Sequence, residues 1–190
     1  MEKFDSLNKR IKEAIIKDYP DKTPVLGEGN INSRVLFIGE APGKEESLQG
    51  RPFVGKAGKN LDEILIKTEL IREQIYITNT VKFRPTKTSA KGTISNRTPN
   101  KKEVANMLPF LLEEIDIISP KIIVTLGNTP LKAIMGQEYN IGICHAQKLQ
   151  YKNHVLFPLY HPAALIYNRE LAEVFERDFF KLKELITLMV

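Results

Sequence analysis

The feature that most constrains this sequence is the alternation of short apolar runs with segments whose apolar residues recur at helical spacing. The apolar runs cover residues 35–38, 75–78, 122–126 and 155–157, and their length suits strands that are buried on both faces. The helical patterns cover residues 4–16, 57–70, 100–119, 128–135 and 169–188. Strands separated by helices predict an α/β fold, here a three-layer α/β/α sandwich around a mainly parallel, four-stranded sheet.

Composition bounds the domain organisation and several classes of site. A chain of 190 residues with 42% hydrophobic and 27% charged residues fits one globular domain, which we expect to span residues 1–190. The single Cys144 excludes an intramolecular disulfide and any site that needs several thiolates. Residues 1–19 lack the apolar core of a signal peptide, so we expect a cytoplasmic monomer without membrane contact.

Ligands of parallel α/β sheets bind at the carboxyl ends of the strands, so the segments that follow the apolar runs are the candidate site. The first of these segments, residues 39–56, is rich in Gly and Pro and presents the carboxylate of Glu40 and the ring of Phe53. Residues 50–56 match the phosphate-loop pattern G-x-x-x-x-G-K, but Ala57 stands where a magnesium-binding hydroxyl is required. A nucleotide-phosphate loop is therefore not expected.

Two later strand ends carry polar side chains suited to base recognition. Asn79 follows the second apolar run, and its amide can both donate to and accept from the edge of a nucleobase, although an Asn there can also cap its own turn. Pro162 restricts His161 to an extended backbone, so the imidazole projects from a fixed position. Taken singly, each of these residues also fits a structural role.

The positive charge of the chain is local. Residues 82–102 contain no Asp or Glu, whereas the rest of the chain has 21 basic and 23 acidic residues. This window predicts either a surface that faces a polyanion or a solvated loop. Its basic residues are Lys82, Arg84, Lys87, Lys91, Arg97, Lys101 and Lys102.

Five segments together carry a resemblance that no single motif provides. Residues 39–43 (GEAPG), 50–58 (GRPFVGKAG), 78–85 (TNTVKFRP), 96–99 (NRTP) and 161–165 (HPAAL) resemble, in order and spacing, the family 4 uracil-DNA glycosylases. The resemblance implies an enzyme of DNA base excision repair that extrudes deoxyuridine from DNA and hydrolyses its N-glycosidic bond. Two alternatives stay open, which are a glycosylase for hypoxanthine, xanthine or mismatched bases and a non-catalytic protein that binds DNA or nucleobases.

The resemblance also implies roles for individual residues. Phe53 corresponds to the aromatic ring that stacks on the extruded uracil, and Asn79 to the amide that reads its edge. His161 corresponds to the donor to uracil O2, and Glu40 to the acidic residue near the attacking water. Glu46 corresponds to a position beside the C5 edge of the base.

Further positions are implied to contact the base or the DNA. The loop backbone around the base would come from Gly39, Ala41 and Gly43. Basic side chains are expected to follow the DNA phosphates, and one of them follows the His-Pro segment as a candidate wedge. The expected DNA-contacting residues are Lys82, Arg84, Lys87, Lys91, Arg97 and Arg169.

The chain departs from the family at the cofactor. Family 4 members typically hold an iron–sulfur cluster on four cysteines, whereas here no Cys precedes Cys144. Phe83 stands at the third ligand position, and Met107 lies about where the fourth is expected. We therefore predict that the chain holds no cluster and no metal, and that apolar packing around Phe83 and Met107 replaces it.

Overall fold

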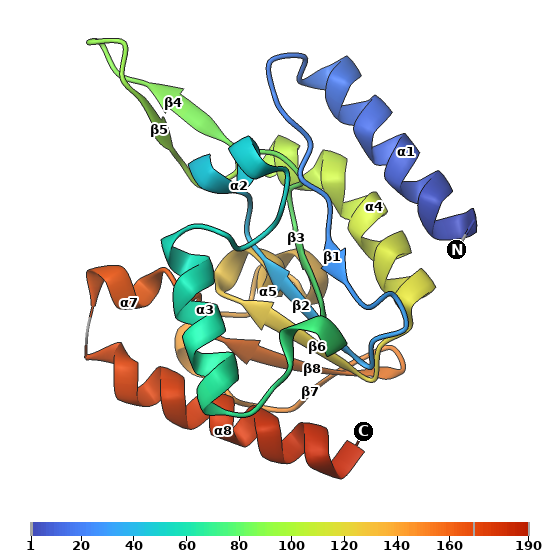
Figure 1. Cartoon of the computed structure of the whole chain (residues 1–190), viewed down its shortest axis with the longest axis vertical. Coiled ribbons are helices and arrows are strands. Elements are labelled where there is room, and N and C mark those ends of the chain that lie inside the picture. The colour runs from blue at the N-terminus through green and yellow to red at the C-terminus, as the bar shows by residue number, and fades with distance from the viewer. Residues whose placement is uncertain (1, 169, 190) are drawn as a thin grey trace.

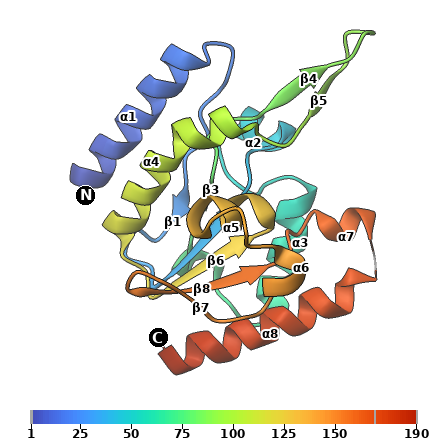
Figure 2. The same cartoon turned by 180° about the vertical axis from the view of Figure 1, so that it is seen from behind.

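A six-stranded sheet lies at the centre of the computed structural model, which describes residues 2–168 and 170–189 (Figures 1 and 2). Its strand order is β1-β3-β2-β6-β8-β7. The four central strands pair in parallel, and they are β3 (Tyr76–Asn79), β2 (Val35–Gly39), β6 (Ile122–Leu126) and β8 (His154–Leu159). These strands form where the sequence has its four apolar runs, so the predicted parallel core is confirmed.

The prediction of four strands is wrong, because two short strands extend the sheet. β1 (Glu28–Gly29) and β7 (Leu149–Tyr151) pair antiparallel at the two edges. They have two and three residues, too few to produce an apolar run in the sequence. Part of the basic segment is also regular, since β4 (Thr86–Thr88) and β5 (Ile94–Asn96) form a separate hairpin that projects from the body (Figure 1).

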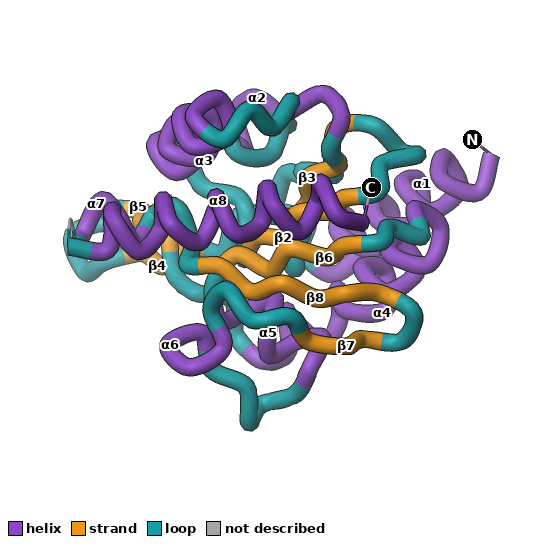
Figure 3. Tube along the Cα trace, turned by 90° about the horizontal axis from the view of Figure 1, so that it is seen from below, coloured by secondary structure: helices purple, strands orange, loops and turns teal. Residues whose placement is uncertain are grey.

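One face of the sheet is covered by α3 (Lys56–Lys67) and α8 (Leu171–Met189) (Figure 3). Leu61 and Leu65 of α3 pack in one apolar cluster with Phe179 of α8 and with strand residues. Strand side chains alternate between the two faces, so every second residue of the central strands points into this layer. Burial of these side chains is the main driving force that fixes the layer.

The opposite face is covered by α4 (Lys101–Ile118), α5 (Asn128–Met135) and α6 (Ile141–Cys144), with α1 (Glu2–Asp18) packed outside α4 (Figures 2 and 3). The three-layer arrangement is therefore as expected. α4 begins with a capping box, because Asn100 Oδ1 accepts from Glu103 N at 2.9 Å and Glu103 Oε2 accepts from Asn100 N at 2.8 Å.

Shorter elements join these helices and strands. These are α2 (Lys44–Gln49), a 3-10 turn at Arg72–Gln74 and α7 (Ala164–Tyr167). Because β2, β3, β6 and β8 are parallel, the loops that follow them meet at one edge of the sheet. Within residues 2–168 and 170–189, no helix combines the length and apolar character needed to cross a membrane.

Candidate active site

A pocket of about 380 Å³ opens at this edge of the sheet. Its wall comes from the segments after β2, β3 and β8 together with the base of the hairpin. The volume lies in the range of small-molecule sites and is large enough for one pyrimidine base. The wall includes Ala41, Gly43, Glu46, Phe53, Asn79, Asn96 and His161.

Asn79 ends β3 and is almost completely buried, with 3% of its surface exposed. Within the described part of the chain, no hydrogen bond occupies its side-chain amide. A Cβ atom placed on Gly39 would lie 2.4 Å from Asn79 Oδ1 and 2.6 Å from Phe53 Cζ. Glycine at position 39 is therefore required for the amide and the aromatic ring to approach the end of β2.

Phe53 is held in a conformation that L-residues rarely adopt. Its φ angle is 54°, in the left-handed region, which costs about 1 kcal/mol or more for a residue with a Cβ atom. Arg72 Nη2 donates to the carbonyl oxygen of Phe53 at 3.4 Å and to that of Pro52 at 3.1 Å, so the loop is fixed from outside. The phenyl ring lies 5.8 Å from the imidazole of His161, measured between ring centroids.

The tautomer of His161 follows from its surroundings. Ala163 N donates to His161 Nδ1 at 3.1 Å, so Nδ1 acts as an acceptor. Burial lowers the pKa of His161 from 6.5 to about 4, so the imidazole is neutral at pH 7. A neutral imidazole with an accepting Nδ1 carries its proton on Nε2. His161 therefore offers an Nε2–H donor from the pocket wall.

Glu46 joins the two halves of the irregular segment after β2. Its Oε2 accepts from Gly43 N at 3.1 Å, and its Oε1 accepts from Val54 N at 3.0 Å and from Gly55 N at 2.8 Å. Three backbone donors to one buried carboxylate fix its orientation strongly. The side chain thus reaches the pocket wall and also braces the loop that carries Phe53.

Glu40 lies beside the pocket, outside its lining. Its carboxylate accepts a hydrogen bond from Thr129 Oγ1 at the start of α5. The sequence prediction did not include Thr129, although it belongs to one of the segments that follow a strand. A lone Thr after a strand carries no distinctive signal, and the contact joins positions 89 residues apart.

Another contact that the sequence did not indicate fixes the His-Pro segment. Asn60 Nδ2, on α3, donates to the carbonyl oxygen of Pro162 at 3.0 Å. Gly127, after β6, lies close by, because a Cβ atom placed there would be 3.3 Å from His161 Cβ. The imidazole is therefore positioned by two neighbouring elements as well as by its own strand.

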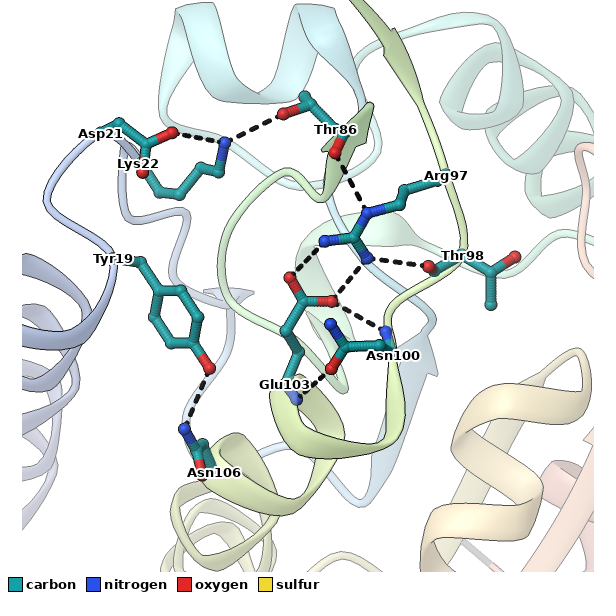
Figure 4. A network of polar contacts seen from close by, with 9 residues as sticks. All are labelled: Tyr19, Asp21, Lys22, Thr86, Arg97, Thr98, Asn100, Glu103 and Asn106. Atoms are coloured by element: carbon teal, nitrogen blue, oxygen red, sulfur yellow. Dashed lines mark hydrogen bonds and ion pairs between the residues drawn. The ribbon is translucent and has the colours of Figure 1, made fainter. Parts of the chain in front are cut away.

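Some basic side chains of residues 82–102 are exposed, whereas others form hydrogen bonds or ion pairs within the protein. Lys87 and Lys91 are exposed on the hairpin, and Arg84 Nε donates to Asn96 Oδ1 at 2.7 Å, beside the pocket. Arg97 forms a bidentate pair with Glu103 at 2.7 Å and donates to the Thr86 carbonyl at 3.0 Å, which braces the base of the hairpin (Figure 4). Arg169 lies outside the described residues.

The expectation that Lys82 contacts DNA is wrong. Its side chain is completely buried, and its Nζ donates to Thr78 Oγ1 at 2.5 Å and to the carboxylate of Glu114 on α4. A buried lysine needs such an anionic partner because an unpaired charge in the interior is costly. Lys82 therefore joins the segment after β3 to α4 and does not reach a ligand.

Two positions at which the resemblance to family 4 implies cluster ligands are apolar and fully buried. Phe83 and Met107 pack with Leu7, Ile11 and Ile15 of α1. Four thiolates would be needed there, and Cys144, the one cysteine of the chain, contacts a different apolar cluster. These residues do not fit an iron–sulfur cluster, and the described residues contain no group of three or more His, Cys, Asp or Glu arranged to hold a metal ion.

Comparisons with known proteins identify the family of this chain. The chain matches the family model described as "Uracil DNA glycosylase superfamily" over residues 26–183. It is 41% identical to a type-4 uracil-DNA glycosylase from Sulfurisphaera tokodaii, over 96% of this chain and 86% of the relative. It is 40% identical to a type-4 uracil-DNA glycosylase from Thermotoga maritima, over 85% of this chain and 82% of the relative.

A solved structure shares the fold. The crystal structure of wild-type SMUG2 from Pedobacter heparinus is similar with a TM-score of 0.59, over 82% of this chain and 75% of that chain. The two sequences are 16% identical, so this likeness concerns the arrangement of the chain alone.

Proposed function

Because the chain belongs to the uracil-DNA glycosylase superfamily, we propose that it hydrolyses the N-glycosidic bond of deoxyuridine in DNA, releasing uracil and leaving an abasic site. The observation that carries the proposal is the convergence of Phe53, Asn79 and His161, from three strand ends, on one pocket of about 380 Å³. Residues 1–190 are proposed to act as one domain in an intracellular monomer.

Recognition of uracil requires that the base leave the stacked duplex, and the pocket offers what an extruded base needs. The ring of Phe53 provides a stacking surface, and the free amide of Asn79 matches the donor and acceptor pattern of the uracil edge. The fixed carboxylate of Glu46 is proposed to lie beside C5, where it leaves no room for the methyl group of thymine. The backbone at Gly39, Ala41 and Gly43 lies around the base.

Bond cleavage produces charge at two places. The sugar becomes oxocarbenium-like and the departing uracil becomes an anion, so electrostatic stabilisation at both ends lowers the barrier. The Nε2–H of neutral His161 would donate to uracil O2 as negative charge develops. Glu40 lies beside the base pocket rather than in it, where its carboxylate would stabilise the sugar cation and orient the attacking water. Water as the nucleophile makes the enzyme monofunctional.

Binding to the DNA backbone is proposed for the accessible part of the basic window. Arg84 lies at the base of the hairpin beside the pocket wall, and Lys87 and Lys91 are exposed farther along it. Contacts to phosphate make affinity fall with salt, because each contact releases condensed counterions. Single-stranded and double-stranded DNA both offer these phosphates.

Catalysis is proposed to proceed without a metal or redox cofactor. The residues at positions 83 and 107 do not supply thiolates, and the proposed roles of Glu40, Asn79 and His161 need none. Purified protein is therefore expected to lack stoichiometric iron. Iron that co-purifies in a fixed ratio would contradict this part of the proposal.

The test is a labelled oligonucleotide with one uracil, incubated with the protein in EDTA and then cleaved with alkali at abasic sites. We expect a cleaved product from the uracil strand and none from a matched thymine strand. A panel with hypoxanthine, xanthine and mismatched bases measures the base scope, and excision there but not at uracil would replace the proposed substrate. Tight binding to the uracil strand without an abasic product would instead identify a non-catalytic binding protein.

A further inference from the structure

Thr129 donates a hydrogen bond to the carboxylate of Glu40, which is proposed to orient the attacking water. Thr129 belongs to none of the motifs that identified the site. We propose that Thr129 is a positioning residue, whose hydroxyl fixes the carboxylate of Glu40 in the orientation that holds the attacking water. The inference rests on the proposed function, because it concerns the same reaction. It adds a residue from a fourth strand end, β6, to the site.

The sheet brings the two residues together. β2 and β6 are adjacent and parallel, with Ile38 opposite Thr125, so the residues that follow these two strands lie side by side. Glu40 is two positions after Ile38, and Thr129 is four positions after Thr125, at the start of α5. The contact between them is therefore a direct consequence of strand register.

Both partners are attached to fixed backbone. The carbonyl oxygen of Glu40 accepts from Val81 N at 3.0 Å, which ties it to the segment after β3. Gly127 N donates to the carbonyl oxygen of Leu159 at 2.8 Å, and Asn128 Oδ1 accepts from Ile141 N at 2.9 Å. The start of α5 is thus held on both sides, so the hydroxyl of Thr129 is presented from a rigid support.

The hydrogen bond restricts a flexible side chain. Within the described residues, Thr129 Oγ1 supplies the one hydrogen bond to the Glu40 carboxylate, and it uses Oε2. A hydroxyl that donates to an ionised carboxylate makes a strong, charge-assisted bond. Oε1 then remains available to accept from a water molecule. Without the hydroxyl, the carboxylate can rotate away from the water, and such small displacements of a reacting group reduce rates severely.

The decisive comparison is Thr129→Val with Thr129→Ser. Valine keeps the shape of threonine but cannot donate, whereas serine keeps the hydroxyl and loses only a methyl group. The assay is single-turnover excision from a uracil-containing duplex at increasing protein concentration, which separates the maximal rate from the half-saturating concentration. We expect Thr129→Val to lower the maximal rate about tenfold with an unchanged half-saturating concentration, and Thr129→Ser to keep at least a third of the rate.

A double-mutant cycle with Glu40→Gln tests whether Thr129 acts through Glu40. We expect Thr129→Val to lower the excision rate about tenfold in the wild-type background and to leave the rate of the Glu40→Gln protein unchanged. The effects of substitutions at two interacting residues are not additive. An equal effect in both backgrounds, or equal rates for the valine and serine variants, would overturn the inference. Melting temperatures of all variants identify any loss of folding, and Thr129→Ala replaces the valine variant if valine does not fold.

The same assay separates this inference from the proposed function. If the wild-type protein releases uracil and Thr129→Val matches it, only the positioning role is rejected. If the wild-type protein releases no uracil, the proposed function fails and the positioning role fails with it.

Discussion

The carboxyl edge of the sheet presents polar side chains with hydrogen-bonding groups left free, whereas the interface between α1 and α4 is filled by apolar side chains. At the edge, the amide of Asn79 and the Nε2–H of His161 face a pocket. At the interface, Phe83 and Met107 pack against Leu7 of α1 without any exposed surface. The carboxyl edge of the sheet therefore offers hydrogen-bonding groups to a ligand, whereas the interface between α1 and α4 contributes apolar contacts that stabilise the fold.

The apolar cluster at this interface joins three parts of the chain. Its members come from α1, from the segment that contains Val81 and Phe83, and from α4. Lys82 and Glu114 add a buried ion pair between the last two of these parts. The comparison teaches that packing joins segments of the chain without requiring one particular chemical group, because burial of apolar surface is not specific to one chemistry, whereas a hydrogen bond to a base edge requires a particular group.

The largest expected effect concerns the apolar interface between α1 and α4. Phe83→Ala removes a fully buried ring, which also lies 4.3 Å from the ring of Tyr19 between centroids. Loss of a buried phenyl group costs about 3–5 kcal/mol of unfolding free energy. Urea denaturation measures this loss, and the excision rate per folded molecule is expected to stay within about threefold of wild type.

Met107→Ala serves as a milder variant if Phe83→Ala does not fold. Either variant would contradict the comparison if it abolished excision while the unfolding free energy was unchanged. That result would mean that the interface between α1 and α4 takes part in the chemistry.

The second prediction concerns the polar side chains at the carboxyl edge of the sheet. Asn79→Ala and His161→Ala each remove a group proposed to contact uracil, and each is expected to lower the single-turnover excision rate by at least about tenfold and up to about a thousandfold. Asn60→Ala, which loses the contact to Pro162 but no proposed contact to the base, is the matched control and is expected to be less affected. Unchanged rates in both site variants would remove their assigned roles.

The third prediction concerns the pH dependence of His161. Its folded pKa of about 4 lies below the ordinary value of 6.5, so the unfolded chain binds more protons between these values. The protein is therefore expected to lose up to about 3 kcal/mol of unfolding free energy as pH falls from 6.5 to 4, and nothing from this group above 6.5. The unfolding free energies of wild type and His161→Gln at pH 7 and pH 4.5 measure this loss. The two proteins should show the same pH dependence if the imidazole is solvated.

The smallest expected effect concerns the hairpin. Lys87→Gln and Lys91→Gln are each expected to reduce the slope of log affinity against log salt by about one, with the maximal excision rate unchanged. Lys12→Gln, on the exposed side of α1, is the matched control and should leave the slope unchanged. An unaltered slope in both hairpin variants would show that DNA does not contact this part of the chain.

Much of the fold followed from local pattern. Apolar runs gave the four central strands because burial on both faces requires continuous apolar sequence, and helical spacing over residues 100–119 gave α4. The edge strands and the β4–β5 hairpin were missed because strands of two or three residues are held by pairing with a neighbour rather than by their own composition. Sequence pattern records burial more clearly than it records backbone pairing.

The candidate site was predicted unevenly for a related reason. Phe53, Asn79 and His161 lie in motifs that resemble a known family, and the structure brings them to one pocket. Gly39, from the same motifs, lies against Asn79 and Phe53. The prediction that Lys82 contacts DNA failed because a positive charge in a sequence gives no information about its partner.

By itself, the sequence determined the parallel core, the chemical groups available at the strand ends and the absence of the thiolates that a cluster needs. Only the tertiary structure decided that Glu114 neutralises Lys82, that Arg97 is held by Glu103, and that Thr129 meets Glu40. Composition and periodicity depend on neighbours along the chain, whereas an ion pair or a hydrogen bond depends on distance in space. Strand register and helix packing set that distance, and they exist only in the folded chain.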